Sequence, residues 1–189
     1  MSAPRNEVRI IGGQWRGRRL RFPPDTGIRP TPDRVRETLF NWLQGSIDGA
    51  RCLDLFAGSG ALGIEALSRG ADSVVLVERD PRVAAYLQAT LTQLDARGGE
   101  VRRVDAQAFL RSGARRFDLV FLDPPFAEGA LEPLLGTLAG SGQLAPAARV
   151  YIEHAARDGL PTLPAGLTPW RSKRAGEVGY HLLAWEGGA

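Results

Sequence analysis

Short apolar runs alternate with helical patterns through the middle of the chain. The runs predict five strands, at residues 52–56, 73–78, 101–104, 117–122 and 149–153. Helices are expected after Gly60 and from Pro81, and further helical segments separate the later strands. Continuous apolar strands connected by helices are typical of a parallel sheet covered on both faces. The pattern therefore predicts an α/β fold, with its chemistry at the carboxyl ends of the strands.

The last part of the chain has a different pattern. Residues 167–173 and 178–185 flank a polar turn, which predicts a hairpin. This hairpin adds two strands to one edge and completes a seven-stranded, mostly parallel sheet with an antiparallel edge. Residues 139–148 are rich in Ala, Gly and Pro, so we expect a flexible connection there.

The first part of the chain predicts a small β extension. Residues 8–22 contain two short strand patterns joined by a glycine turn. Thr31, which precedes a proline, is a typical helix cap, and an apolar stripe follows it. We therefore expect a basic extension at residues 1–30 and a main domain at residues 31–189, with a lid helix at residues 31–44.

Positive charge is concentrated in the same extension. Residues 1–40 carry nine arginines and four acidic residues, a net charge of +5, so residues 41–189 carry −2 of the total of +3. Arginines at one end of a nearly neutral body are typical of proteins that dock on phosphates. We expect phosphate contacts from the arginines, and stacking from the tryptophan, among Arg9, Trp15, Arg16, Arg18, Arg19, Arg29 and Arg34.

The composition excludes several classes of protein. No apolar run reaches the roughly 18 residues needed to cross a bilayer. The first residues lack the apolar stretch of a signal peptide, so we expect a cytoplasmic protein. The single cysteine, Cys52, excludes an internal disulfide and a multi-cysteine metal site, and we expect no metal. Cys52 lies in an apolar strand pattern and is expected to be a buried thiol.

A glycine-rich turn follows the first predicted strand of the main domain. Gly58, Gly60 and Gly63 match the G-x-G-x-x-G pattern, in which glycines let a nucleotide approach the backbone. Glu78 follows the second strand, where a carboxylate accepts hydrogen bonds from ribose hydroxyls. Taken alone, this motif favours a nucleotide cofactor such as NAD.

Two further acidic positions favour a cationic cofactor instead. Asp54 lies within the first strand, four residues before the first glycine, where an NAD site needs no carboxylate. Asp105 follows the third strand and can accept the exocyclic amine of an adenine, with the Ala106 backbone N–H beside it. An acid for a cation, an acid for a ribose and an acid for an adenine together predict S-adenosylmethionine. We expect its contacts from Asp54, Phe56, Ala57, Gly58, Gly60, Glu78, Asp105, Ala106 and Asp123.

The fourth strand delivers Asp123, Pro124, Pro125 and Phe126 to the same edge of the sheet. An amine on a heteroaromatic ring is a weak nucleophile, because its lone pair is delocalised into the ring. Asp123 and the Pro124 carbonyl can each accept one of its N–H groups, while Phe126 stacks on the ring. Pro124 and Pro125 donate no hydrogen bond and hold φ near −65°, which keeps the carbonyls aimed at the substrate. We therefore expect these four residues to form a catalytic pocket for a planar amine.

With these residues in place, the chain resembles a known family, the bacterial methyltransferases that modify the exocyclic N2 amine of a guanine in 16S ribosomal RNA. The resemblance rests on Arg9-Ile10-Ile11-Gly12-Gly13, Arg16-Gly17-Arg18, the stretch from Arg29-Pro30-Thr31 to Leu43, the glycine-rich turn, Val77-Glu78 and Asp123-Pro124-Pro125-Phe126. The glycine-rich turn and the tetrapeptide occur in many methyltransferases, whereas the two amino-terminal stretches are specific to this group. The resemblance covers nearly the whole chain.

This resemblance implies a Rossmann-like class I S-adenosylmethionine-dependent methyltransferase. It implies a monomer that acts on 16S ribosomal RNA, within the small ribosomal subunit or its assembly intermediate. We expect the guanine to rotate out of its stack into the pocket of Asp123 and Phe126, where the methyl group is transferred directly. Relatives usually carry an asparagine near Thr90, which this chain lacks. Glu153 ends the fifth strand at the same edge, and the sequence assigns it no role.

Three other functions stay open at this point. A methyltransferase of DNA or of another RNA uses a similar tetrapeptide, but the DNA enzymes usually add a large base-recognition domain for which this chain has no room. An NAD oxidoreductase fits the glycines and leaves Asp54 and Asp123 without a role. A non-catalytic RNA-binding module fits the basic extension and leaves the cofactor residues without one.

Overall fold

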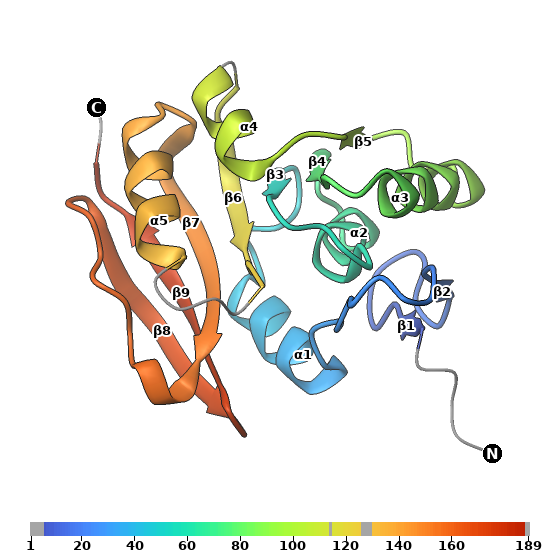
Figure 1. Ribbon diagram of the computed structural model, residues 1–189, viewed down its shortest axis with the longest axis horizontal. Helices are drawn as coiled ribbons and strands as arrows, with labels where there is room; N and C mark the ends of the chain where they lie inside the picture. The colour runs from blue at the N-terminus through green and yellow to red at the C-terminus, as the bar shows by residue number, and fades with distance from the viewer. Residues whose placement is uncertain (1–5, 114, 126–129, 188–189) are drawn as a thin grey trace.

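The computed structural model describes residues 6–113, 115–125 and 130–187. A seven-stranded sheet with the order β5-β4-β3-β6-β7-β9-β8 forms its centre, and β1 and β2 form a separate two-stranded sheet. The strands are β1 (Glu7–Arg9), β2 (Arg19–Arg21), β3 (Arg51–Asp54), β4 (Ser73–Val77), β5 (Gly99–Arg102), β6 (Phe117–Leu122), β7 (Leu144–Ala155), β8 (Leu167–Ala175) and β9 (Val178–Trp185). β3 to β7 run parallel, while β9 runs antiparallel to both of its neighbours. The predicted seven-stranded sheet and its antiparallel edge are confirmed (Figure 1).

Helices cover both faces of the large sheet (Figure 1). They are α1 (Asp33–Trp42), α2 (Ala61–Ser68), α3 (Pro81–Gln93), α4 (Ala106–Ser112) and α5 (Leu131–Gly140), and a short 3-10 helix, η1, spans Ala156–Asp158. α1, α2 and α3 pack on one face, around Leu39, Ile64 and Leu87. α4 and α5 pack on the other face, around Leu110 and Leu135. In the described ranges, no helix is both long enough and apolar enough to cross a membrane.

The stretch at residues 139–148 differs from the expected flexible connection. It contains the end of α5 and the start of β7, where Leu144 pairs with Phe117 of β6. The register between β6 and β7 then shifts before Leu119, and Ala147 has a positive φ of 60°. The sequence predicts only the second half of the strand because Pro146 and the small residues beside it interrupt the apolar run.

The start of α1 also differs from the prediction. The helix begins at Asp33, and Pro32 occupies the cap position without a side-chain hydrogen bond. The Thr31 hydroxyl does not cap the helix, because it donates to Glu153 Oε1 at 2.9 Å instead. Thr31 therefore connects the beginning of α1 to the carboxyl end of β7.

The amino-terminal extension packs on the main domain. β1 and β2 pair antiparallel, as predicted, and their Val8 and Leu20 lie in the same core as α1 and α2. Gly13 has a φ of 74°, and a Cβ atom there would overlap the Ser68 carbonyl at the end of α2. This close approach lets the Gln14 N–H donate to that carbonyl at 2.7 Å. The glycine turn is therefore the place where the extension docks on α2.

A buried ion pair joins the extension to two helices. Arg36 of α1 is 1% exposed and Glu65 of α2 is 0% exposed, and the distance from Arg36 Nη1 to Glu65 Oε2 is 3.1 Å. Arg36 also donates to the carbonyl oxygens of Thr31 at 3.1 Å and Arg9 at 2.9 Å. Glu65 Oε2 accepts from the Ile11 N–H at 2.9 Å. Buried charges are tolerated when their hydrogen-bonding capacity is satisfied in this way.

We expect the substitution Arg36→Met to lower the free energy of unfolding by about 3 kcal/mol, because it leaves the Glu65 carboxylate buried without its main partner. Arg69 remains beside Glu65 at 2.8 Å. The loss of unfolding free energy should therefore lie near the lower end of the range for breaking a buried ion pair. Urea denaturation measures this change. Arg34→Met, which alters an exposed arginine of the same helix, should stay within about 0.5 kcal/mol of wild type. An Arg36 variant as stable as this control would contradict the assigned role.

Candidate active site

Acidic residues gather at the carboxyl ends of four neighbouring strands. Asp54 is the last residue of β3, Glu78 follows β4, Asp123 follows β6 and Glu153 lies near the end of β7. These strands are adjacent in the sheet, so their carboxyl ends form one edge. The sheet order therefore brings together residues that are up to a hundred positions apart in the chain.

Three of these carboxylates share one face of the sheet. Phe121 of β6 and Tyr151 of β7 belong to the core under α1, α2 and α3. Side chains two positions apart along a strand lie on the same side, so Asp123 and Glu153 are on that face too. Asp54 pairs in register with Phe121 and joins them. The result is a row of acids across three adjacent parallel strands.

The glycine-rich turn lies against the first of these acids. Gly60 has a φ of 77° and leads directly into α2, a backbone conformation that residues with a side chain rarely adopt. The Gly63 N–H donates to Asp54 Oδ2 at 3.0 Å. A Cβ atom at Gly63 would overlap the Leu76 side chain of β4. These glycines therefore allow the tight turn and the close packing of α2 on the sheet.

The environment of Asp54 destabilises the ionised form of its carboxyl group. Burial raises its pKa from 3.8 to about 7. Hydrogen bonds from the backbone N–H groups of Gly63 and Phe56 lower the pKa in part, and repulsion from Glu78 raises it. A cation near Asp54 would offset both burial and repulsion. The turn and its acid therefore fit a positively charged ligand.

Glu78 connects the glycine-rich turn to the start of α3. Its Oε2 accepts from the Gly58 N–H at 3.2 Å, and its Oε1 accepts from the Asp80 N–H at 2.8 Å. Asp80 in turn caps α3, because its carboxylate accepts from the N–H groups of Arg82 and Val83. Glu78 is half-buried, at the position where the sequence predicts a ribose contact.

Asp105 has a structural role that the sequence did not predict. It is the N-cap of α4, and its Oδ1 accepts from the Ala108 N–H at 3.1 Å. Its side chain is exposed, while Ala106, the first residue of the helix, is buried. The capping bond occupies one carboxylate oxygen and holds the side chain at the same edge of the sheet as Glu78.

The expected amine pocket begins directly after β6. Asp123 is half-buried, Pro124 is buried and Pro125 is exposed, and Phe126 lies outside the described residues. Burial raises the pKa of Asp123 well above 3.8, and repulsion from Glu153 and Asp54 raises it further. Hydrogen-bond donors on a ligand would relieve this destabilisation of the carboxylate.

Glu153 is the acidic residue that the sequence left without a role. It is 4% exposed, and its Oε1 accepts hydrogen bonds from the hydroxyls of Tyr151 at 2.8 Å and Thr31 at 2.9 Å. Burial raises the pKa of Glu153, and these two hydrogen bonds lower it in part. An acid at the end of a buried strand was the available signal, but its importance depends on β7 lying next to β6.

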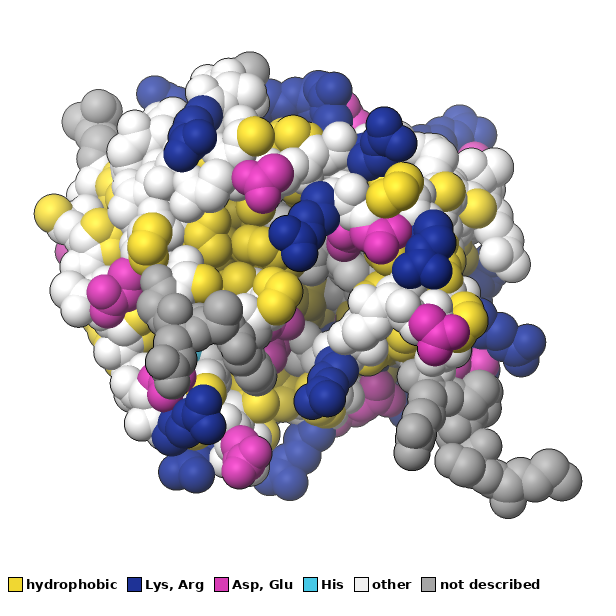
Figure 2. Space-filling model, viewed as in Figure 1, with side chains coloured by type: hydrophobic (Ala, Val, Ile, Leu, Met, Phe, Trp, Pro, Cys, Tyr) yellow, Lys and Arg dark blue, Asp and Glu magenta, His cyan; other side chains and the backbone are white. Residues whose placement is uncertain are grey.

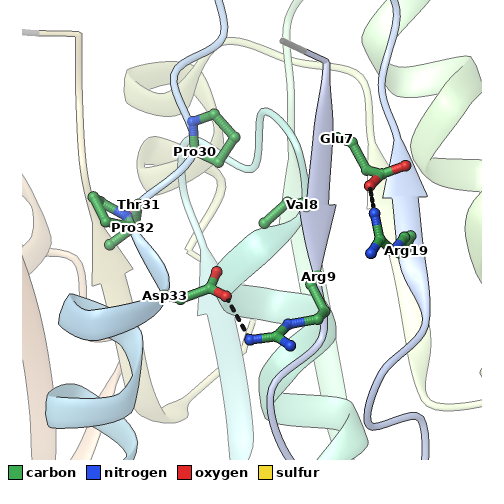
Figure 3. Close-up of a pocket in the computed structure, with 8 residues that line it drawn as sticks. All are labelled: Glu7, Val8, Arg9, Arg19, Pro30, Thr31, Pro32 and Asp33. Atoms are coloured by element: carbon green, nitrogen blue, oxygen red, sulfur yellow. Dashed lines mark hydrogen bonds and ion pairs between the residues drawn. The ribbon is translucent and has the colours of Figure 1, made fainter. Parts of the chain in front are cut away.

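A groove adjoins this acidic edge. It has a volume of about 410 Å³ and is lined by Glu7, Val8, Arg9, Arg19, Pro30, Thr31, Pro32 and Asp33 (Figure 3). Arg9 pairs with Asp33 at 3.2 Å and Arg19 pairs with Glu7 at 2.6 Å, so both arginines are held in place. Thr31 lines the groove and also donates to Glu153. The groove is therefore one hydrogen bond away from the row of acids.

The remaining arginines predicted to contact phosphates lie at the surface. Arg16, Arg18, Arg29 and Arg34 are exposed, and none of them pairs with an acidic residue in the part of the chain that the structure describes. Lys and Arg side chains surround an apolar hollow near the middle of the face in Figure 2. Such unpaired guanidinium groups are free to bind an anionic partner.

Trp15 corrects the prediction for the extension. Its side chain is 8% exposed and belongs to the core that includes α1 and α2. Its ring is therefore covered by protein and is not presented for stacking on a base. Trp15 therefore anchors the extension on the core, whereas Arg16 and Arg18 beside it face solvent.

Cys52 is a buried thiol, as expected, and is 1% exposed. Burial raises its pKa, which keeps the thiol neutral and unreactive. Within the described ranges, no group of three or more His, Cys, Asp and Glu side chains is placed to hold a metal ion.

Known proteins are similar to this chain in both sequence and fold. A family model described as "Conserved hypothetical protein 95" matches residues 8–184. Ribosomal RNA small subunit methyltransferase D of Escherichia coli (strain K12) is 49% identical over 180 residues, which cover 95% of this chain and 91% of that protein. The solved structure of E. coli yhhF, described as a methyltransferase, has a TM-score of 0.89 at 49% identity and covers 95% of this chain and 98% of that chain. An RNA methyltransferase from Salinibacter ruber, solved with S-adenosyl-L-homocysteine, has a TM-score of 0.65 at 19% identity and covers 85% of this chain and 96% of that chain.

The class of enzyme follows from these findings together with the site. The E. coli relative spans nearly the whole chain, and the glycine-rich turn, the row of acids and the sheet order form one edge. An NAD oxidoreductase and a non-catalytic RNA-binding module are thereby excluded. The chain belongs to the family of Conserved hypothetical protein 95, and it is a methyltransferase with the Rossmann-like, S-adenosylmethionine-dependent fold.

Proposed function

We propose that this methyltransferase acts on the exocyclic N2 amine of a guanine in 16S ribosomal RNA. It does so as a cytoplasmic monomer, on the small ribosomal subunit or its assembly intermediate. The observation that carries this proposal is the row of Asp54, Asp123 and Glu153, which suits a cation beside an amine that donates hydrogen bonds. The name of the 49% identical E. coli relative, a small-subunit ribosomal RNA methyltransferase, supports the same substrate for this chain.

The proposed cofactor contacts follow from the acidic edge. S-adenosylmethionine supplies an electrophilic methyl group, because its sulfur is a positively charged sulfonium. Asp54 favours this charge, since a cation offsets the burial that raises its pKa to about 7. Glu78 accepts hydrogen bonds from ribose hydroxyls, and Asp105 with the Ala106 N–H takes the adenine. Phe56, Ala57, Gly58 and Gly60, which follow Asp54 in the chain, supply further contacts to the cofactor.

The proposed pocket orients the amine. Asp123 and the Pro124 carbonyl each accept one N–H, which turns the nitrogen lone pair towards the methyl group. The amine becomes acidic as the new N–C bond forms and then loses one proton, so orientation is the main role of Asp123. Phe126 holds the flipped base by stacking, worth about 1–3 kcal/mol, which offsets part of the few kcal/mol of unstacking.

We further propose that the extension at residues 1–30 docks on the RNA backbone and that the segment at residues 31–44 forms the lid. Arg9 and Arg19 line the groove beside the acidic edge, where a strand can pass on its way to the pocket. The exposed contacts come from Arg16, Arg18, Arg29 and Arg34. Trp15 is left out of this interface because it is buried.

Asp123→Ala is expected to lower methyl transfer at least about 100-fold, because the amine loses the acceptor that orients it. Binding of S-adenosylmethionine should persist in calorimetry, since Asp54 and Glu78 remain. Asp158→Ala, at an exposed carboxylate in η1, is the matched control and should leave transfer unchanged. Labelled S-adenosylmethionine with assembled small subunits, bare 16S ribosomal RNA or DNA gives the readout. Wild-type turnover by Asp123→Ala would contradict the pocket, and transfer to DNA alone would replace the proposed substrate.

The stability of the protein without cofactor should depend on pH through Asp54. Between the unfolded pKa of 3.8 and the folded pKa of about 7, the folded chain holds a proton that the unfolded chain has lost. The free energy of unfolding therefore falls as the pH rises through this window. Relative to wild type, Asp54→Asn should gain roughly 2–3 kcal/mol between about pH 5 and pH 8 in urea denaturation.

Saturating S-adenosylmethionine provides the control for this pH effect. A cation stabilises the ionised Asp54 carboxylate, so the wild-type protein should lose less stability on raising the pH when the cofactor is bound. A stability difference between wild type and Asp54→Asn that is the same at all pH values would overturn the assigned electrostatics.

RNA binding should weaken steeply as salt rises, because arginines that contact phosphates release counterions. The triple variant Arg16→Ala, Arg18→Ala, Arg34→Ala is expected to reduce the slope of log affinity against log salt by about 2–3 units, roughly one for each contact. Filter binding to 16S ribosomal RNA measures this slope. Arg97→Ala, at an exposed arginine that pairs with Asp95, should leave it unchanged. An affinity that does not respond to salt would show that the arginines only keep the extension soluble.

A further inference from the structure

Glu153 presents a carboxylate oxygen that the fold does not use. Its hydrogen bonds from the Tyr151 and Thr31 hydroxyls, at 2.8 Å and 2.9 Å, both reach Oε1. Within the part of the chain that the structure describes, no residue donates to Oε2. A buried carboxylate anchored through one oxygen is held in a fixed orientation, and its second oxygen retains its capacity to accept hydrogen bonds.

This carboxylate lies next to the proposed amine pocket. β6 and β7 are parallel, and Leu122 pairs in register with Ile152. Asp123, which directly follows β6, and Glu153 of β7 are the next residues after this pair, so they are neighbours and share one face of the sheet. Burial and then repulsion from Glu153 raise the pKa of Asp123, as expected for two carboxylates at close range. The pocket thus presents two acceptors side by side.

Two adjacent acceptors match one nucleobase among those that carry an exocyclic amine. In guanine, the N2 amine is flanked by the N1–H group, so two donors point in the same direction. In adenine, the N6 amine is flanked by the acceptor N1, and in cytosine the N4 amine is flanked by the acceptor N3. Those acceptors would face a carboxylate and be repelled. A site with one carboxylate can hold any of the three amines, but a second carboxylate beside it favours guanine.

We propose that Glu153 selects guanine, by accepting the N1–H group at Oε2 while Asp123 accepts an N–H of the N2 amine. This inference rests on the proposed function, and it assigns the choice of base to one residue. The Pro124 carbonyl can accept from any exocyclic amine, whereas Glu153 faces the ring atom beside that amine.

The partners of Glu153 support this role. Burial alone raises its pKa and favours the protonated form, which is a poorer acceptor. The hydroxyls of Tyr151 and Thr31 donate to the ionised form and lower the pKa in part, so they favour the form that accepts the N1–H. Tyr151 is buried below Glu153 on β7, and Thr31 approaches it from the start of α1. The Glu153 carboxylate is therefore held by a hydroxyl of its own strand and by a hydroxyl of the segment before α1.

The test uses 2-aminopurine, which carries the same N2 amine as guanine but has an acceptor at N1. Small subunits are assembled from 16S ribosomal RNA with either guanine or 2-aminopurine at the methylated position, and kcat/KM is measured on both. The wild-type protein should prefer guanine by about 10- to 100-fold, as expected for one hydrogen bond to a charged group. In Glu153→Gln the hydroxyls still bond the amide oxygen, and the amide nitrogen replaces Oε2. Because this nitrogen donates to N1 of 2-aminopurine and opposes the N1–H of guanine, the preference should fall to parity or reverse.

Two controls separate base selection from a general loss of structure. Glu177→Gln makes the same chemical change at an exposed position and should keep the wild-type preference. Tyr151→Phe keeps the Glu153 carboxylate and removes one of its anchors, so its preference for guanine should lie between those of wild type and Glu153→Gln. Binding of S-adenosylmethionine to each variant is measured by calorimetry and should equal that of wild type.

The outcomes distinguish this inference from the proposed function. If wild type methylates the guanine particle, and Glu153→Gln and Tyr151→Phe both keep its full preference over 2-aminopurine, then Glu153 does not select the base and the inference is overturned. If wild type methylates neither particle, the proposed ribosomal substrate itself is wrong. A preference that falls in Glu153→Gln, with cofactor binding intact, establishes the role of Glu153.

Discussion

The buried carboxylate of Glu65 holds together three segments of this protein: α2, α1 and the amino-terminal extension. It lies on α2, the helix that begins at the glycine-rich turn, and it binds Arg36 of α1 at 3.1 Å and the Ile11 N–H of the extension at 2.9 Å. A carboxylate that is removed from water is strongly destabilised unless donors surround it, so these segments are held together by the need to satisfy one charge. The glycine-rich turn, α1 and the basic extension are therefore held in fixed positions relative to one another.

The acidic edge differs, because the donors that the protein supplies to Asp54 and Glu153 offset the burial of these carboxylates only in part. Asp54, Asp123 and Glu153 repel one another or are desolvated, and the pKa of each is raised. Folding therefore places carboxylates where their ionised forms are destabilised. Under the proposed function, a sulfonium near Asp54 and N–H donors at the other two carboxylates offset this instability. Binding energy is concentrated at the reacting groups in this arrangement, while Arg36 and Glu65 supply rigidity elsewhere. The protein thus combines a well-paired buried charge between its helices with partly compensated carboxylates at the edge of its sheet.

The sequence predicts those features that depend on local patterns. Buried parallel strands require continuous apolar runs, and a glycine turn requires glycines, so the sheet and the cofactor turn were predictable. The first half of β7 was not predictable, because Pro146 and the small residues beside it interrupt the apolar run, and the backbone there is irregular at Ala147. The burial of Trp15 and the pairing of Arg36 with Glu65 depend on contacts between distant segments. No local sequence pattern distinguishes the buried Arg36 from the exposed arginines near it. Glu153 was visible as an acid at a strand end, but its meaning required the neighbouring position of β6.

Thr31 shows how a broken local rule can indicate function. A threonine before a proline at the start of a helix usually caps it, and a missing cap costs about 1 kcal/mol. In this chain the Thr31 hydroxyl donates to Glu153, and α1 begins without a side-chain cap. The fold accepts this loss at a residue that lines the groove and donates a hydrogen bond to Glu153. Arg36 of α1 also donates to the Thr31 carbonyl. A shift of α1 would therefore move Thr31, and with it a hydrogen-bond donor of Glu153. Under the proposed function, Thr31 connects the recognition of the RNA backbone with the chemistry of the base through a single hydrogen bond.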